Sequence, residues 1–336
     1  MMVGVVMVAA LVGASQGGAA PAKPKPTPAT AATASPLSWA EVLEQNPDPK
    51  VVTDADFLKR ITETKLPWRV KDKATGMEML LVPPGKFVMG MSPGDTKAQY
   101  NEKPAHEVTI TKAFYLGRTE VTQEQWVKVM GENPSYFKKS NEGRETMIAK
   151  YIEEGLTKQE AQEKTGAESN KWLTASNPVE NVSWDDCQKF CAKTGMKLPT
   201  EAQWEYACRA GVRKPTYGEL DQIGWNFDNT HFTTHSVGQK TPNALGFYDM
   251  IGNVEEWCQD FYLNGYYKSC ADGVVDPTGP TQSEAAANDY GDEVSRVLRG
   301  GGWLDNANGC RASDRGGTAP GIQNIPVGCR FARTAD

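Results

Sequence analysis

The stretch Arg296-Val-Leu-Arg-Gly-Gly-Gly-Trp303 near the C-terminus decides the fold. Val297 and Leu298 predict a short buried strand, because two apolar residues stand between arginines and a turn signal. The three glycines allow backbone conformations closed to residues with side chains, or the close approach of another segment. Trp303 provides a large apolar anchor just beyond the bend. The chain from Leu304 to Pro326 then has almost no periodicity, which is typical of a functional loop.

Together with this stretch, further motifs along the chain resemble the formylglycine-generating enzyme, or sulfatase-modifying factor, family. They are Met79-Leu-Leu-Val-Pro-Pro-Gly-Lys-Phe-Val-Met-Gly90, Thr119-Glu-Val-Thr-Gln123, Asn181-Val-Ser-Trp184, Leu198-Pro-Thr-Glu-Ala-Gln-Trp-Glu-Tyr-Ala207 and Leu245-Gly-Phe-Tyr-Asp-Met-Ile-Gly-Asn-Val-Glu-Glu-Trp257. The resemblance implies an α+β, C-type-lectin-like fold with little regular secondary structure. We expect this domain to cover residues 76–334.

The N-terminal region is expected to precede that domain in three parts. An apolar run ending in small residues predicts a signal peptide over residues 1–20, and a Pro/Ala-rich linker follows over 21–36. These segments predict a secreted or periplasmic protein, attached to a membrane only if the signal segment stays uncleaved. Residues 37–75 are interpreted as a helical extension, with one helix beginning at Ser38 and another capped within Thr53–Asp56.

Several helices are marked by capping signals. Thr122 with Gln125 and Thr200 with Gln203 form capping boxes, and Ser183 is the expected first cap of a helix that carries Cys187 and Cys191. Residues 138–176 are an insertion that the family pattern does not require. Their spacing of apolar residues predicts a helical hairpin on the surface, interpreted as a tolerated excursion in preference to a docking element.

Charge and cysteine content narrow the function further. A net charge of −6, without a Lys/Arg-rich block, argues against nucleic acid as a partner. Seven cysteines in an exported chain suggest disulfides and at least one free thiol. Cys310 could pair with Cys329, or with Cys258, which would leave Cys329 for Cys191 or Cys208. The sequence does not choose between these pairings.

The resemblance implies a calcium site in the irregular segment before Trp257. By position, Asp249 and Glu256 would contribute carboxylates, and Gly252 and Val254 would contribute backbone carbonyls. Hard oxygen donors spaced closely in a loop suit the flexible coordination of calcium. The alternative is that both carboxylates only accept hydrogen bonds from backbone amides.

The resemblance also implies copper-dependent oxidation of a cysteine in a protein substrate, through two cysteines that bind copper(I). The second of these positions falls on Cys310, but the first falls on Asp305. A carboxylate is a hard donor and does not replace a thiolate for copper(I). The sequence therefore makes this activity doubtful for the chain.

Two functions remain, both with an exported protein or peptide, or a surface ligand, as partner. In the first, the chain is a protein-modifying oxidoreductase with an altered ligand set, in which Cys310 is the reactive thiol and Asp305 and Arg311 tune its ionisation. In the second, the loop from Leu304 to Pro326 is a non-catalytic recognition surface. The residues expected to line that surface are Asn306, Asn308, Arg311, Asp314, Arg315 and Gln323.

Overall fold

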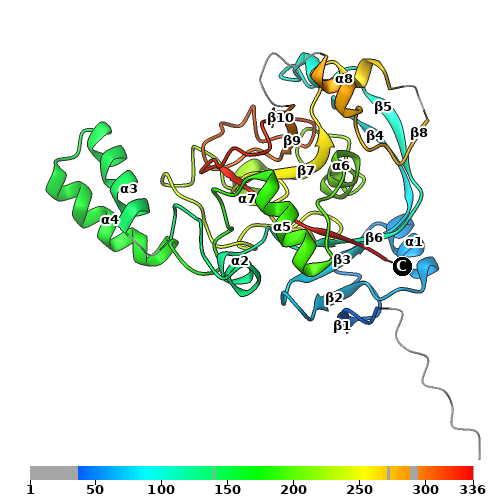
Figure 1. Ribbon diagram of the computed structural model, residues 1–336, viewed down its shortest axis with the longest axis horizontal. Helices are drawn as coiled ribbons and strands as arrows, with labels where there is room; N and C mark the ends of the chain where they lie inside the picture. Colours follow the sequence, from blue (N-terminus) through cyan, green and yellow to red (C-terminus); the bar gives the residue numbers. More distant parts are fainter. Residues whose placement is uncertain (1–36, 139–140, 271–272, 288–293, 336) are drawn as a thin grey trace, which may run out of the picture. The chain divides into compact units, whose positions relative to one another are not determined.

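The computed structural model describes residues 37–138, 141–270, 273–287 and 294–335 (Figure 1). The predicted signal peptide and linker lie outside these ranges and stay predictions. In the part of the chain that is described, no helix is long and apolar enough to cross a membrane.

Three small sheets form the framework. The first has the order β1-β2-β3-β6-β12, the second β10-β9-β7-β11 and the third β4-β5-β8. Their bounds are β1 Ala40–Glu44, β2 Arg69–Asp72, β3 Glu78–Val82, β4 Gly85–Met89, β5 His106–Ile110, β6 Phe114–Gly117, β7 Glu255–Phe261, β8 Val274–Val275, β9 Arg296–Arg299, β10 Arg315–Thr318, β11 Val327–Gly328 and β12 Ala332–Thr334. The strand predicted around Val297 is confirmed as β9, which pairs with β7 and β10.

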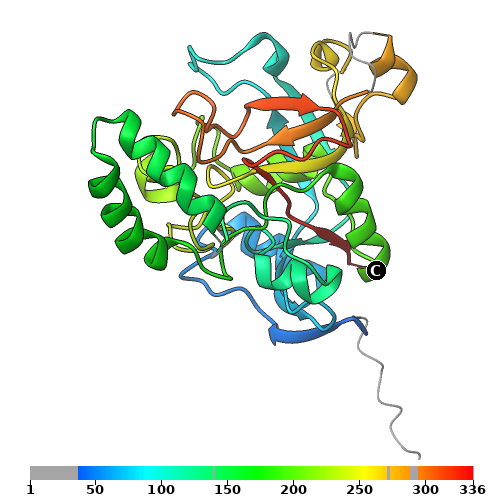
Figure 2. The same ribbon diagram turned by 60° about the vertical axis from the view of Figure 1, so that its left-hand side comes forward.

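Eight α-helices are described outside the sheets. They are α1 Ala55–Thr64, α2 Gln123–Met130, α3 Asn141–Glu153, α4 Lys158–Trp172, α5 Trp184–Thr194, α6 Glu201–Arg209, α7 Leu220–Ile223 and α8 Gln282–Ala286, with 3-10 turns at Tyr100–Glu102 and Tyr266–Lys268. The capping boxes predicted at Thr122 and Thr200 are confirmed, and Ser183 caps α5. Residues 138–176, expected to form a helical hairpin, contain α3 and α4, which lie side by side away from the sheets in both views (Figures 1 and 2).

Two expectations about local structure are wrong. The helix expected from Ser38 is strand β1, which pairs antiparallel with β2 through Ala40 opposite Asp72 and Val42 opposite Val70. Pairing with a neighbouring strand outweighed the local helical pattern there. No strand is expected around Trp257, which follows a segment expected to be irregular, but Glu255–Phe261 form β7, the longest strand described.

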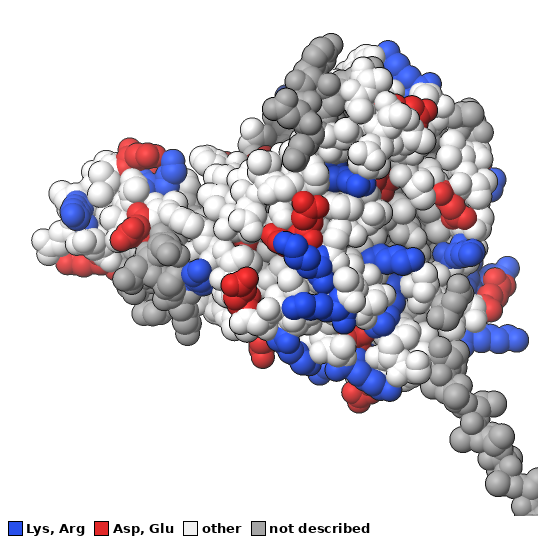
Figure 3. Space-filling model, viewed as in Figure 1, with Lys and Arg blue, Asp and Glu red and all other residues white. Residues whose placement is uncertain are grey.

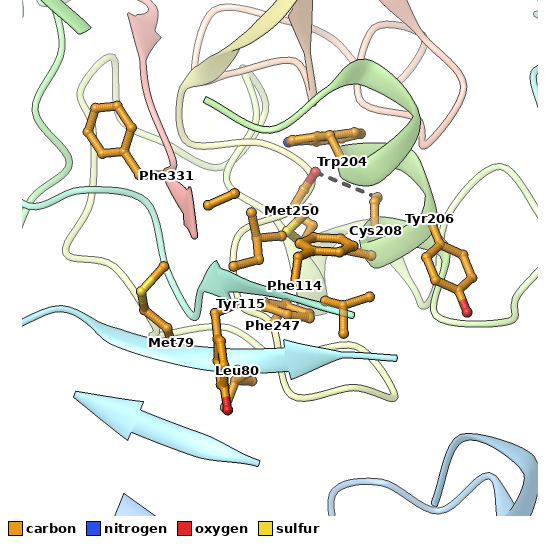
Figure 4. Packing of buried hydrophobic residues seen from close by; sticks show 14 of the residues in the cluster. Met79, Leu80, Phe114, Tyr115, Trp204, Tyr206, Cys208, Phe247, Met250 and Phe331 are labelled. Carbon is orange, nitrogen blue, oxygen red and sulfur yellow. Dashed lines mark hydrogen bonds between the residues drawn. The ribbon is translucent and has the colours of Figure 1, made fainter. Parts of the chain in front are cut away.

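The main core lies between the first sheet and helix α6. Figure 4 shows Phe114 of β6 with Met79 and Leu80 of β3 on one side and Trp204 and Cys208 of α6 on the other. The irregular chain between α7 and β7 packs into the same core through Phe247 and Met250, and the Cys208 thiol donates a long hydrogen bond of 3.8 Å to the Met250 carbonyl.

The buried Asn243 side chain supports that irregular segment. Its amide donates to the carbonyls of Ala207 (2.8 Å) and Cys208 (3.1 Å), and its carbonyl accepts the backbone N–H groups of Leu245 and Phe247. Side-chain hydrogen bonds of this kind replace the backbone ladders that irregular chain lacks.

Candidate functional site

The glycine turn after β9 has the conformations that the sequence predicts for two of its three residues. Gly300 and Gly301 have φ values of +97° and +66°. A Cβ on Gly301 would lie 2.7 Å from the Gly309 carbonyl oxygen and 3.1 Å from the Cys310 sulfur. A side chain is thus excluded there, because the loop that follows folds back onto the turn.

Trp303 anchors the loop next to the insertion. Its ring is buried and meets Phe137 edge-on, with centroids 4.9 Å apart, and Leu173 completes this cluster. Phe232 contacts both this cluster and the apolar side of α3, where Tyr151 lies. The insertion is therefore packed beside the candidate loop.

Asp305 closes the turn, and its carboxylate has a structural contact. Its Oδ2 accepts the Gly302 N–H (2.9 Å), and its carbonyl accepts the Phe227 N–H (2.9 Å). Burial raises the pKa of the Asp305 carboxyl, while the hydrogen bond from Gly302 lowers it. The carboxylate thus satisfies a backbone donor inside the turn.

Cys310 lies beneath the turn as a buried thiol. Its sulfur is 4.0 Å from the Gly302 carbonyl oxygen and 3.9 Å from that of Asp305. Burial raises the pKa of this thiol far above its ordinary value, and the negative charges of Asp305 and Asp314 raise it further. At neutral pH the side chain is the protonated, weakly nucleophilic form.

Arg311 does not serve Cys310 as expected. Its guanidinium forms a bidentate pair with Glu102 (2.7 Å to each oxygen) and also contacts Asp95 (3.0 Å) and Asp314 (2.8 Å). Only 3% of Arg311 is exposed. The residue holds the loop against the turn at Tyr100–Glu102, so the prediction of a ligand contact receives no support from its placement.

Arg315 is buried in the same manner. Its Nε and Nη2 donate to the two carboxylate oxygens of Glu201, at 2.6 and 2.8 Å. Arg299 of β9 lies beside it, pairs with Glu205 of α6 and donates to the Ala312 carbonyl (2.9 Å). This network was not predicted; its signal in the sequence was two glutamates four apart on α6 together with repeated arginines near the C-terminus.

The exposed part of the loop is smaller than the sequence suggested. Asn306, Asn308 and Gln323 remain exposed, whereas Asp314 is half-buried against Arg311. Apolar side chains accompany them: Leu304 and Ile322 are 41% and 48% exposed, and Phe227, held to the loop through Asp305, is 48% exposed. The surface thus combines amide groups with separate apolar side chains.

The segment expected to bind calcium is buried and carries excess negative charge. Gly238 N–H donates to Asp249 Oδ2 (2.6 Å), while Oδ1 has no hydrogen-bond partner among the described residues. Glu256 accepts Arg330 Nη2 (2.7 Å) and the Trp204 indole N–H (2.7 Å).

A third carboxyl group, which the sequence analysis did not single out, lies close to these two. Glu120 accepts Asn253 Nδ2 (2.7 Å) and the Val254 N–H (3.0 Å). Burial, followed by the charges of Asp249 and Glu256, raises the pKa of Glu120 well above its ordinary value. Burial also raises the pKa of Asp249 to about 6.

Gly252 and Val254, whose carbonyls were expected to bind the ion, are buried in the same segment, and Gly252 has a φ of +86°. In the described ranges, no group of three or more His, Cys, Asp or Glu side chains is placed to hold a metal. A calcium ion would therefore depend on two carboxylates and backbone oxygens. Asp249 Oδ1 fits that requirement, but Glu256 would have to share its oxygens with Arg330.

The copper donor set does not fit. A copper(I) dithiolate needs two soft sulfur donors, and the position of the first is taken by Asp305, whose carboxylate is a hard donor that already closes the turn. All seven cysteines are free thiols in the structure, so none of the pairings weighed from the sequence is formed.

The fold is that of C-type-lectin-like proteins, an α+β domain whose long irregular segments close on a glycine turn. A family model for the sulfatase-modifying factor enzyme 1-like domain matches residues 65–335, and the chain belongs to that family.

Proteins with different names are similar to this chain. The chain is 33% identical over 263 residues to the serine/threonine-protein kinase pkn1 of Chlamydia pneumoniae, covering 76% of this chain but only 38% of the kinase. It is 28% identical to the formylglycine-generating enzyme of Streptomyces coelicolor, covering 76% of this chain and 88% of that enzyme. Treponema denticola variable protein 1 has a similar structure, with a TM-score of 0.57 and 26% identity over 77% of this chain and 95% of that one.

Glu180, which lies under the insertion, gives a pH-dependent test of this packing. Its Oε1 accepts the Phe137 N–H (2.7 Å), whereas Oε2 has no hydrogen-bond partner in the described part of the chain. Burial raises the pKa of Glu180 to about 8, against the lowering effect of that hydrogen bond. The folded protein therefore holds a proton that the unfolded chain releases near pH 4.

The stability contributed by this proton is complete at low pH and is lost as pH rises through about 8. The free energy of unfolding of wild type should fall as pH rises from 5 to 9. In Glu180→Gln, which keeps an acceptor for Phe137, this fall should be smaller by on the order of 2–4 kcal/mol. Urea unfolding across this range measures the slope. Glu63→Gln, at an exposed helix position, is the control and should match wild type; identical slopes for Glu180→Gln would contradict the assignment.

Proposed function

We propose that the chain is a non-catalytic binding member of the sulfatase-modifying-factor family, with an exported protein or peptide as its partner. The observation that carries this proposal is the state of Asp305 and Cys310. The Asp305 carboxylate closes the glycine turn by accepting the Gly302 N–H. Cys310 is a buried thiol whose pKa is raised by burial and by nearby carboxylates. Neither is arranged as a nucleophile or as a soft metal ligand.

The recognition surface would be the exposed part of the loop with its neighbours, namely Phe227, Leu304, Asn306, Asn308, Ile322 and Gln323. Apolar anchors among amide groups are characteristic of protein-binding surfaces. The loop is held from below by buried ion pairs, so its exposed residues could vary without disturbing the core. On the face seen in Figure 3, Lys and Arg are interspersed with Asp and Glu, without a broad area of one sign.

The copper(I) test separates this proposal from the enzymatic alternative. Wild-type protein should bind no copper(I) at the Asp305–Cys310 position and should leave a cysteine-containing sulfatase peptide unchanged, because this position has only one thiol. Asp305→Cys should gain copper(I) affinity by several orders of magnitude, measured by competition with a chromogenic chelator.

Asp305→Asn is the matched control, since it keeps an acceptor for Gly302 N–H but supplies no thiol. Stoichiometric copper(I) on wild-type protein, together with formation of an aldehyde in the peptide, would overturn the proposal.

The binding surface is tested by a photo-crosslinking residue placed at Asn308 of the protein in its natural producer. A discrete cross-linked product is expected from this position, and Leu304→Asp should remove it by placing a charge within an apolar contact. The control position is Val275, which is 57% exposed on a different sheet. The same products from both positions, or none from Asn308, would count against a recognition surface at the loop.

We also propose that the segment from Asp249 to Glu256 binds calcium in a structural role. The support is the Asp249 oxygen that has no hydrogen-bond partner among the described residues, and the nearby charge of buried Glu256, which adds to burial in raising the pKa of Asp249. A cation would offset that repulsion. Calcium should then raise the melting temperature of wild-type protein by a few degrees, and a chelator should reverse the change.

Asp249→Asn should abolish the response to calcium, whereas Asp48→Asn, on the N-terminal segment, should keep it. A wild-type melting temperature that is the same in calcium and in excess chelator would remove the calcium proposal while leaving the binding function untouched.

A further inference from the structure

Three cysteines gather where helix α5 meets the C-terminal segment. Cys187 and Cys191 are four residues apart and therefore lie on one side of α5. Cys329 directly follows β11. Burial raises the pKa of the Cys329 thiol, and the neighbouring thiols of Cys187 and Cys191 raise it further. Cys187 likewise contributes to the raised pKa of Cys191.

The backbone around these thiols is fixed on both sides of the contact. Phe190 of α5 stacks on Phe331, with ring centroids 4.5 Å apart and an interplanar angle of 8°. Just beyond α5, Lys197 N–H donates to the Ala332 carbonyl (2.9 Å), and Ala332 N–H donates to the Lys197 carbonyl (2.7 Å). The two segments that carry the sulfurs are thus held together without a covalent bond.

The three thiols differ in access to solvent. Cys187 and Cys329 are fully buried, whereas Cys191 is partly exposed. No metal-binding group of three side chains is present among the described residues, so the cluster is not explained as a metal site. Two buried thiols on adjacent segments and a third that is partly exposed are instead suited to thiol–disulfide exchange.

We propose that Cys187 and Cys329 form a disulfide under oxidising conditions, with Cys191 as the thiol through which a small disulfide oxidant enters. Burial raises the pKa of Cys191 to about 12, so only a small fraction of this side chain is thiolate at neutral pH. That thiolate attacks glutathione disulfide and releases one glutathione thiolate. Cys329 then attacks the Cys191 sulfur and releases the second glutathione, and Cys187 attacks the Cys329 sulfur and restores the Cys191 thiol. Two protein thiols are oxidised, and one glutathione disulfide is reduced to two glutathione molecules.

The bond would join α5 to the chain directly after the candidate loop. It would close the segment from Cys187 to Cys329, which contains α6, β7, β9 and the whole loop from Leu304 to Pro326. A cross-link over so long a segment restricts the unfolded chain strongly. Oxidation would thus fasten the end of the recognition loop to the body of the domain.

The test compares the full-length protein in dithiothreitol and in glutathione disulfide, with free thiols alkylated after acid quenching. Peptide mapping without reductant should find a Cys187–Cys329 cross-link. Oxidation should raise the melting temperature by roughly 5–10 °C. Cys187→Ser and Cys329→Ala should each lose the oxidation-induced rise, and Cys270→Ser should keep it.

The rise is measured within each variant, so a lower intrinsic stability does not obscure the result. Cys191→Ser should form the same cross-link during refolding in a glutathione buffer but several-fold more slowly from the folded state. A free, alkylated Cys329 after oxidation, or a stable bond from it to Cys191 or Cys310, would overturn the proposal.

Discussion

The ion pairs between α6 and the two strands around the glycine turn are the constraint on which the rest of the C-terminal half depends. Glu205 pairs with Arg299 of β9, and Glu201 pairs with Arg315 of β10, all buried. Arg299 also donates to the Ala312 carbonyl inside the loop. Removing one member of such a network leaves an uncompensated buried charge, at a cost of about 3–5 kcal/mol. The network therefore specifies where the loop lies.

Because these buried ion pairs fix its position, the loop can be irregular and still adopt one conformation. Gly300 and Gly301 allow the chain to reverse closely over Cys310, and Trp303 fastens the turn to Phe137. The carboxylate of Asp305 completes the turn from within. Asp305 and Cys310, at the two family copper positions, are thus packed within the turn, and the surface proposed for recognition is the solvent-facing part of the loop.

Local signals in the sequence predicted the capped helices α2, α5 and α6. Capping boxes at Thr122 and Thr200 act within a few residues, so they are readable without knowledge of the fold. Strand β7 was missed because it buries polar residues: Glu256 is paired with Arg330, and Asp260 accepts the Glu201 N–H (2.9 Å). Such partners are distant in the sequence, and a polar residue with a distant partner resembles a surface residue.

Distant partners also explain why the burial of the candidate-site arginines was not predicted. Arg311 and Arg315 were expected at the surface because they stand in an irregular polar segment, yet their carboxylate partners lie more than a hundred residues earlier. Asn306 and Asn308, which are exposed, were predicted as loop residues. The glycine turn was predictable because its demands are local to the backbone.

Native-state hydrogen exchange in Glu201→Gln measures most directly whether the buried ion pairs hold the loop. This variant keeps the shape of the side chain but removes its charge. The backbone amides of Trp303 and Ala312 donate hydrogen bonds to the carbonyls of Asn253 and Pro215. Our account predicts that the exchange protection of these two amides falls at least tenfold, while that of the Gly195 amide at the end of α5 is unchanged. Unchanged protection at Trp303 and Ala312, or an equal loss at all three amides, would contradict it.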